Sequence, residues 1–459
     1  MWRAFLNILK VKELRNRLMF TALIIVLVRV ASNIPCPGVD PAALERFIKE
    51  VTNASGADGG FMALIDLFSG GALAHFALGA LGIMPYISAS IILQLMIPVI
   101  PQLEKMQREG ETGRQKITQY TRYLTIIVCL IQGAMVAMAM VNPTKIGLPN
   151  PSEPLFLGRV EVFVPVTVLV ITCTTMVFTW LGEQVTERGI GNGVSLIITI
   201  NIVSRLPHSV IELVNMAIKG TTPDGTTFKS VQLLLLLVVF CIVTAATILL
   251  SQGYRRVPIQ MVRKTVGKQL QGGSTYMPLK VNFANVMPII FAGAIMMIPG
   301  YLFQTMAARS GGVWMTLATF FRQDGPGYMT VYSILILAFS FFWVANQFNP
   351  LQIADNLKKE GAFIPGISPG QPTADFLDGA MTRVTAGGAV FLLALAVFPM
   401  VLYSNFRIPF MVAQFFGGTS LLIMVGVVLD TMSQLESHLT MRHYEGFLKS
   451  GRLKNRSGS

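Results

Sequence analysis

The stretch FSGGALAHFALGALGIMPYISASIILQL, residues 68–95, decides how this chain folds. It is apolar enough to enter a lipid bilayer, yet it opens on two adjacent glycines, Gly70 and Gly71, and further glycines and a proline interrupt it. A spanning helix needs about 20 apolar residues whose backbone is bonded internally. The stretch therefore predicts two pieces, a short Gly-rich helix over 68–81 and a longer helix over 83–100. Since a broken helix is tolerated at membrane depth only inside protein or along a water-filled cavity, we expect the chain to enclose a passage.

The composition places the whole chain in a membrane. Of its 459 residues 53% are hydrophobic and only 13% are charged, a balance that is unusual for a soluble protein of this length. The first 17 residues predict an amphipathic helix on the membrane surface. The apolar runs predict ten spans, near 18–34, 64–100, 119–141, 159–182, 191–207, 231–253, 285–304, 328–349, 382–401 and 410–432.

The basic residues predict an orientation. With the N-terminus in the cytoplasm, most of the 36 Lys and Arg fall in cytoplasmic segments, as the positive-inside rule requires. The net charge of +13 then lies almost entirely on one face. Two interpretations stay open for this charge, a signal of topology alone or a docking surface for acidic lipid, RNA or protein.

Sequence motifs for enzymatic chemistry are missing. The chain has no HExxH, CxxC or Walker motif, its four histidines are scattered, and we expect neither a metal site nor a cofactor. Its four cysteines do not form a disulfide framework. A membrane enzyme is therefore the weakest hypothesis. A solute carrier is the more serious rival, but ion-coupled carriers place Asp, Glu or His within their spans, and here the clearest charge inside a span is Arg29. We expect Arg29 to face protein or the far interface.

Six blocks of sequence, taken in order along the chain, resemble the SecY family, the large subunits of the bacterial protein-conducting channel. The opening stretch is the first of them, FSGGAL followed by LGIMPYISASIILQL. The others are GETGRQKITQYTRY (110–123), WLGEQVTERGIGNGVS (180–195), PLKVNFANVMPIIFA (278–292), FNPLQIADNLKKEGAFIPGISPGQPT (348–373) and FGGTSLLIMV (416–425).

The resemblance implies an all-α integral membrane protein with ten transmembrane helices in two pseudo-symmetric, inverted halves around a central pore. The halves would be 18–207 and 208–434, preceded by the cytoplasmic helix 1–17 and followed by a cytoplasmic tail, 435–459. The broken second helix would supply a plug within 64–81. The implied function is a passive channel that passes unfolded secretory polypeptides across the membrane and releases apolar segments sideways into lipid.

The resemblance also implies residue roles. A pore for any polypeptide cannot use a specific binding site, but a ring of aliphatic side chains can close by dewetting and yield to a moving chain. The implied ring is Ile83, Ile87, Ile198, Ile290, Leu302 and Ile423, of which Ile83 and Ile87 share a helix face by their spacing. The implied plug is Phe68, Ser69, Gly70, Gly71, Ala72, Leu73, His75 and Phe76. The implied lateral gate is Ser88, Ile91, Gln94 and Pro299, between the helices 83–100 and 285–304.

Two long cytoplasmic loops, 252–284 and 350–381, resemble the loops that receive the motor ATPase SecA and the ribosome. Their docking residues would be Arg255, Arg256, Arg263, Lys264, Lys358 and Lys359. Small subunits resembling SecE and SecG would complete the complex, whose other partners would be signal sequences, unfolded secretory proteins and membrane lipid. The implied location is a bacterial plasma (inner) membrane. Ser368 departs from the family, which often carries an arginine there, so either neighbouring lysines compensate or motor coupling differs.

Overall fold

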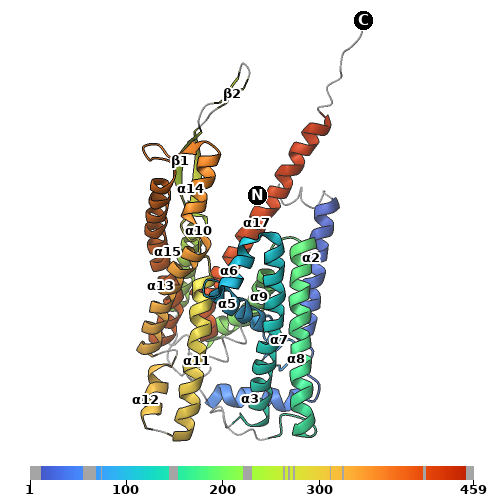
Figure 1. Ribbon diagram of the computed structural model, residues 1–459. Helices are drawn as coiled ribbons and strands as arrows, with labels where there is room; N and C mark the ends of the chain where they lie inside the picture. Colours follow the sequence, from blue (N-terminus) through green and yellow to red (C-terminus); the bar gives the residue numbers. More distant parts are fainter. Residues whose placement is uncertain are drawn as a thin grey trace.

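Helices dominate the computed structural model of this protein, and the predicted all-α membrane architecture is confirmed. Long helices run roughly side by side, and a small β-structure projects from one end (Figure 1). A helix overlaps each of the ten predicted spans. The structure describes residues 12–54, 69–73, 75–143, 153–220, 230–261, 264–266, 269–271, 274–310, 312–322, 325–406 and 410–450.

The first half of the chain forms one group of helices. Four of them are long, whereas α3, α5 and α6 are short, and α3 lies across the end of the group (Figure 1). The elements are α2 (Lys12–Ala31), α3 (Pro41–Ala54), α5 (Met84–Met96), α6 (Pro101–Arg108), α7 (Glu111–Val141), α8 (Val160–Arg188) and α9 (Gly193–Lys219).

The second half forms a second group, interrupted by a β-structure after its first helix. Its helices are α10 (Ser230–Gln252), α11 (Met287–Ser310), α12 (Val313–Phe320), α13 (Pro326–Gln347), α14 (Pro350–Lys359), α15 (Gln371–Phe406), α16 (Phe410–Gly417) and α17 (Thr419–Ser450). Its strands are β1 (Tyr254–Met261), β2 (Lys264–Val266), β3 (Gln269–Gln271), β4 (Ser274–Lys280) and β5 (Ala362–Phe363).

Within the described residues, seven helices are long and apolar enough to cross a membrane: α7, α8, α9, α10, α13, α15 and α17. An eighth span results if α5 and α6 are counted together, although they meet at 104°. The remaining two predicted spans correspond to α2 and α11. In α2 three arginines, Arg15, Arg17 and Arg29, lower the apolar character, and in α11 the apolar helix found is the shorter Met287–Met296.

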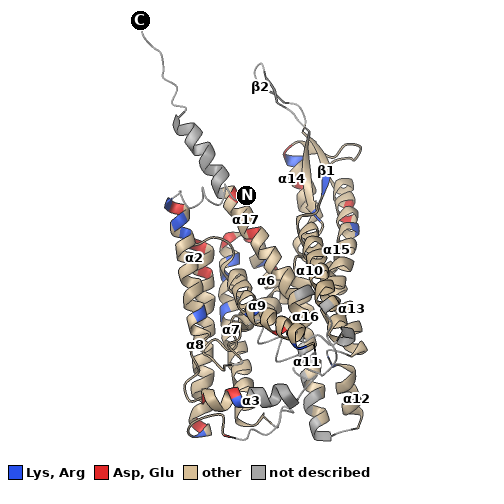
Figure 2. Ribbon diagram, turned by 180° about the vertical axis from the view of Figure 1, so that it is seen from behind, with Lys and Arg blue, Asp and Glu red and all other residues tan. Residues whose placement is uncertain are grey.

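The helices leave a central region where the two groups meet. Helices α2, α7 and α8 lie on one side and α10, α13 and α15 on the other, with α5, α9 and α17 between them (Figures 1 and 2). Helix α17 packs against α9 of the first group and against α10 of the second. The start of α2 and the end of α17 lie at the same end of the molecule, where many of the coloured charges in Figure 2 also gather.

The predicted loop 252–284 is a β-hairpin. Strands β1 and β4 pair antiparallel, from Tyr254 opposite Lys280 to Gln260 opposite Ser274. Val257 and Ile259 are buried at alternate positions of β1, as expected for a strand with one covered face. Strand β5, from the predicted loop 350–381, pairs with the other edge of β1. The two cytoplasmic loops predicted separately are therefore joined by one three-stranded sheet, in the order β4-β1-β5.

Candidate functional site

Isoleucines from both helix groups converge at the centre of the molecule. Ile83, Ile198 and Ile423 are 1%, 7% and 3% exposed and belong to one apolar cluster, against which Ile87 and Ile290 pack. They lie at the starts of four helices: Ile83 caps the N-terminus of α5, Ile87 lies in its first turn, and the others lie within the first two turns of α9, α11 and α17. Five of the six predicted ring residues are thus brought together.

Leu302 is the sixth predicted ring residue and lies apart from the others. Its side chain is 47% exposed, and it is not a member of the isoleucine cluster. It lies twelve positions beyond Ile290 along α11, which is about three helical turns at 3.6 residues per turn. One straight helix does not bring both side chains to the same level, so Leu302 does not join the five clustered isoleucines.

The cluster is made of stiff, branched side chains. Besides the five isoleucines it contains Phe178 and Val185 of α8 and Ile197 and Ile202 of α9. Isoleucine has a restricted side-chain torsion, so it presents a fixed apolar surface. Ile87 and Ile290 pack against a second cluster as well, which lies between α5 and the second helix group. The isoleucine cluster is therefore continuous with that interface.

The predicted plug segment precedes this constriction, and its conformation differs from the prediction. A helix over 68–81 is wrong for residues 70–73 and 75–81, which form successive turns, while Phe68 lies outside the described residues. Gly70 and Gly71 have φ of +69° and +94°, and Phe76 has a φ of +41°. These left-handed residues are incompatible with a continuous right-handed helix.

The end of the plug segment is fastened to the chain that follows α2. The Cys36 amide donates to the Phe76 carbonyl at 2.9 Å, and the Leu78 amide donates to the Ile34 carbonyl at 2.8 Å. The Phe76 side chain is 1% exposed and packs in an apolar cluster with Cys36. Burial raises the pKa of the Cys36 thiol, so the thiol stays neutral.

The plug segment also contributes to a small pocket. His75 is exposed and lines a cavity of about 110 Å³. The other lining residues are Asn33, Pro35, Pro41, Leu44 and Glu45. The pocket therefore lies where the plug meets the start of α3.

Near the glycine pair, the plug segment touches two membrane helices. The guanidinium of Arg29, in α2, donates from Nη1 to the Gly70 carbonyl at 3.2 Å. The hydroxyl of Ser204, in α9, lies 3.4 Å from the same oxygen. Ser69 and Ala72 are buried beside them at 1% and 0% exposure. Arg29 therefore faces protein, as one of the two predicted alternatives requires, and its partner is the plug.

The predicted lateral gate joins α5 to the second helix group. Ile91 is 6% exposed and shares a cluster with Phe291 of α11, Trp343 of α13 and Leu377 of α15. Ser88 is half-buried on the same helix. Pro299 is half-buried inside α11.

Gln94, a member of the predicted lateral gate, makes no hydrogen bond across this interface among the described residues. Its amide nitrogen donates to the Ser90 hydroxyl, 3.1 Å away on the same helix. Its amide oxygen is buried without a partner among the described residues. Helix α5 also ends at Met96, before the predicted end at Ile100. Pro98 explains this end, because proline has no backbone N–H to continue the helical hydrogen bonds, although Ile97 before it keeps helical angles of φ −55° and ψ −52°.

The predicted docking residues lie on the β-structure and on α14. Arg255 and Arg256 are exposed on β1, and the Arg256 guanidinium lies 5.3 Å from the centre of the Tyr254 ring. Lys358 and Lys359 are exposed at the end of α14. Lys264 belongs to β2, and Arg263 lies outside the described residues. Ser368 is exposed, and its carbonyl accepts a 2.8 Å hydrogen bond from the Thr373 hydroxyl.

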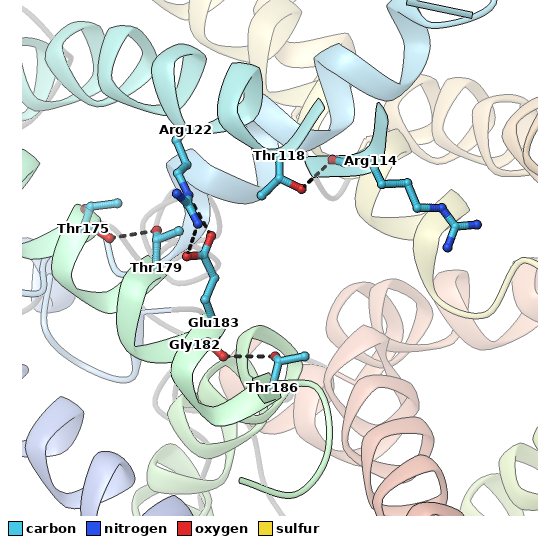
Figure 3. Close-up of polar contacts among 8 residues, drawn as sticks. All are labelled: Arg114, Thr118, Arg122, Thr175, Thr179, Gly182, Glu183 and Thr186. Atoms are coloured by element: carbon cyan, nitrogen blue, oxygen red, sulfur yellow. Dashed lines mark hydrogen bonds and ion pairs between the residues drawn. The ribbon is translucent and has the colours of Figure 1, made fainter. Parts of the chain in front are cut away.

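Sequence reasoning missed an ion pair that braces the first helix group. Arg122 of α7 binds Glu183 of α8 through two hydrogen bonds, Nε to Oε1 at 3.0 Å and Nη2 to Oε2 at 2.6 Å (Figure 3). The Glu183 side chain is 18% exposed, so this bidentate pair is partly shielded from water. Both residues occur in blocks quoted for the family resemblance. The sequence signal that could have predicted this ion pair is the presence of opposite charges at neighbouring ends of two consecutive spans.

The turn between α8 and α9 is fixed next to this ion pair. The Thr186 hydroxyl donates to the Gly182 carbonyl at 3.0 Å (Figure 3) and accepts from the Gly193 amide at 2.9 Å. Helix α9 begins with Asn192, whose side chain accepts from the Ser195 amide. The start of α9, which carries Ile198, is therefore held by specific polar contacts.

No group of three His, Cys, Asp or Glu side chains within the described residues is placed to hold a metal ion. The site consists of an apolar constriction, a glycine-rich turn beside it and an apolar interface between helix groups. Such a site can hinder or admit a chain.

Comparison with known proteins gives a consistent result. A family model described as SecY matches residues 77–432. The protein translocase subunit SecY of Chlamydia muridarum (strain MoPn / Nigg) is 40% identical over 458 residues, which cover 98% of this chain and 99% of the relative.

Solved structures show the same fold at low sequence identity. One solved structure has a TM-score of 0.60 and 18% identity to this chain. It is described with the words "The plug domain of the SecY protein stablizes the closed state of the translocation channel and maintains a membrane seal". It covers 95% of this chain and 94% of its own. Sec61 in the canine ribosome-channel complex from the endoplasmic reticulum has a TM-score of 0.59 and 17% identity, with the same coverage.

Proposed function

Because this chain belongs to the SecY family, we propose that its isoleucine cluster is the constriction through which unfolded secretory polypeptides cross the membrane. The family forms protein-conducting channels, so the chain is a channel subunit and not an enzyme. The observation that carries the proposal is the convergence of five isoleucines from both helix groups on one central cluster. A polypeptide pore needs such a surface because it must pass every kind of side chain without binding any of them.

The apolar constriction also accounts for closure at rest. Water leaves a narrow channel lined by aliphatic groups, and hydrated ions then meet a barrier. The glycine-rich turn from Ser69 to Leu73 lies in the path as a plug that adds to this barrier. Its turns fit a mobile element, because glycines give up few side-chain contacts when the segment moves.

The interface between α5 and α11 is the proposed exit into lipid. Its core consists of interlocking apolar side chains such as Ile91 and Phe291, which can separate without breaking hydrogen bonds. A signal sequence with about ten Leu-like residues favours lipid by roughly 3–6 kcal/mol. That free energy biases the sorting of a segment once the interface opens.

The end of the molecule that carries the β-hairpin is the proposed docking face. Exposed Arg255, Arg256, Lys358 and Lys359 give this face a positive charge suited to the anionic surface of a ribosome. The canine relative is described in a complex with the ribosome. We assign the same face to a SecA-like motor, and the lipid-exposed helices to subunits resembling SecE and SecG. The membrane is then a bacterial plasma membrane, with both chain termini in the cytoplasm.

A crosslinking experiment tests the constriction. Cysteine is placed at Ile87 in a background without the four native cysteines, and the reconstituted channel engages a secretory precursor stalled halfway through export. We expect a precursor adduct at position 87. The matched control is Ile92→Cys, on the same helix but 40% exposed and outside the cluster. If the precursor is protease-protected yet position 87 forms no adduct, or if both positions react equally, the constriction does not lie at these isoleucines.

A further inference from the structure

The glycine pair of the plug is held from two sides. On the first side, α2 contributes Arg29, which donates to the Gly70 carbonyl at 3.2 Å. On the other, α9 contributes Ser204, whose hydroxyl is 3.4 Å from the same oxygen and 2.7 Å from the Asn201 carbonyl. Donors from two spanning helices therefore approach one carbonyl oxygen of a segment that must move.

The fit around this turn leaves no space for a side chain. A methyl group at Gly70 would lie 2.6 Å from Arg29 Nη1 and 3.0 Å from the Asn201 Cα. A methyl group at Gly71 would lie 2.8 Å from the Arg205 Cζ. Both glycines have positive φ, which a side chain would also disfavour. The turn thus fits closely between two guanidinium groups.

We propose that Arg29 is a positioning residue that latches the plug in its closed place through the Gly70 carbonyl. This inference rests on the proposed function, in which the segment from Ser69 to Leu73 blocks the pore. A buried carbonyl that loses its donor costs free energy, so a displaced plug must find new partners for Gly70. The arginine must likewise be resolvated when the turn leaves. The closed place is therefore favoured by the contacts that Gly70 makes there.

The charge of the latch adds to this preference. Arg29 lies against Gly70 and Arg205 against Gly71, so two like charges are held in the same region. The partial negative charge of the Gly70 oxygen lies close to the Arg29 guanidinium and stabilises its charge there. When the plug departs, this stabilisation ends. A latch of this kind resists leakage at rest but yields to a polypeptide that occupies the constriction.

The test measures ion leakage through the idle reconstituted channel in planar bilayers. Arg29→Gln removes the charge while leaving a polar side chain, and we expect idle conductance to rise several-fold. Arg29→Lys keeps the charge with fewer donors, so its leakage should fall between that of the wild type and that of Arg29→Gln. The matched control is Arg17→Gln on the same helix, whose partner is Glu13, and its leakage should remain at the wild-type level.

A second readout follows the plug itself. Cysteine at Leu73, in a background without native cysteines, is labelled from the far side with a membrane-impermeant maleimide. We expect Arg29→Gln to raise its labelling rate several-fold. Gly70→Ala should act in the same direction because it pushes the turn from its place. Gly361→Ala is its control, since Gly361 has nearly the same φ, +70°, but a methyl group added there would meet no atom within 4 Å.

The outcomes separate the latch from the plug. Deleting residues 69–73 should raise leakage if the plug seals the pore. If the deletion leaks and Arg29→Gln neither leaks nor increases labelling, the latch is wrong and the plug stands. If the deletion itself leaves conductance unchanged, the segment is not a plug, and the latch proposal, which depends on the plug, is wrong as well.

Discussion

At the scale of single residues, charge inside the first helix group has two different uses. Arg29 reaches a backbone carbonyl of the plug, a partner that can leave. Arg122 instead reaches the carboxylate of Glu183 in a neighbouring spanning helix, through two short hydrogen bonds. A bidentate pair between two long helices is rigid, whereas a single bond to a glycine turn is breakable. The first group therefore combines a fixed brace with a movable contact.

The brace makes a prediction about stability. Glu183→Gln removes the negative charge and one good acceptor while the Arg122 guanidinium stays partly shielded, so we expect the free energy of unfolding to fall by about 1–2 kcal/mol. The apparent melting temperature of the purified channel in detergent should fall by on the order of 2–4 °C. The measurement is thermal unfolding at fixed detergent and lipid concentration.

An exposed ion pair provides the control for this substitution. Arg46 and Glu153 also form two hydrogen bonds, at 2.9 and 3.0 Å, but their side chains are 67% and 53% exposed. Glu153→Gln should therefore cost less than about 0.5 kcal/mol. Equal losses for the two variants would mean that the Arg122–Glu183 pair is no stronger than an ordinary surface pair.

The sequence could identify the residues of the constriction only through family resemblance. From hydropathy alone Ile198 and Ile423 are indistinguishable from isoleucines that face lipid, because every face of such a span is apolar. Leu302 shows the limit of the resemblance, since an offset of about three turns along α11 separates it from Ile290. The contact of Arg29 with Gly70 could not be read from sequence either, because it depends on how the glycine turn packs against α2 and α9.

At the scale of elements, the sequence-based prediction differs from the structure in two segments, 68–81 and 252–284. The predicted helix over 68–81 assumed that an apolar run continues as a helix, but positive φ at Gly70 and Gly71 breaks it into turns. The predicted loop 252–284 contains alternating buried residues, Val257 and Ile259, which are the signal of a strand. The positions of the long spans were predicted correctly, because a run of about twenty apolar residues is typical of a membrane-spanning helix.

The interface of α5 and α11 makes a prediction about gating. Ile91→Ala removes a 6% exposed side chain from the cluster that joins α5 to the second helix group. Such a truncation destabilises the closed packing by about 2–5 kcal/mol, and an open interface is destabilised less. The channel should therefore open more readily. We expect several-fold higher export of a precursor whose signal sequence has a shortened apolar core, measured in reconstituted vesicles.

The adjacent isoleucine supplies the matched control. Ile92 lies on the same helix but is 40% exposed, so Ile92→Ala should leave export of the weak precursor unchanged. Export of a precursor with a normal signal sequence should be similar in all three proteins, which shows that the variants remain folded. If Ile91→Ala exports the weak precursor no better than Ile92→Ala, the Ile91 cluster does not hold the gate closed.

At the scale of the whole molecule, the fold connects the face that we propose for docking to the centre of the molecule. Strand β1 joins β4 and β5, so the segments 252–284 and 350–381 form one platform. The Val257, Leu279 and Ile364 side chains of this platform share a cluster with Ile91 and Phe291 of the interface. Continuous packing therefore links the platform to the interface that we propose as the lateral gate.

This connection makes the charge of the platform functionally important. A variant with Arg255→Glu, Arg256→Glu, Lys358→Glu and Lys359→Glu reverses four exposed charges on the face proposed to meet the ribosome. We expect ribosome affinity to fall at least about tenfold near 0.1 M salt, and the slope of log affinity against log salt to flatten by about one for each phosphate that the variant no longer binds. Binding is measured by sedimentation of ribosomes with the reconstituted channel over a salt series.

A second variant carries two reversals on the predicted far face, Arg159→Glu and Lys219→Glu, both at exposed positions. Its affinity and salt slope should equal those of the wild type, because charges beyond a Debye length of about 10 Å are screened at about 0.1 M salt. A reduced affinity in this variant as well would mean that net charge, and not the platform, attracts the ribosome. If the four-charge variant binds ribosomes with wild-type affinity, the docking surface does not include these four residues.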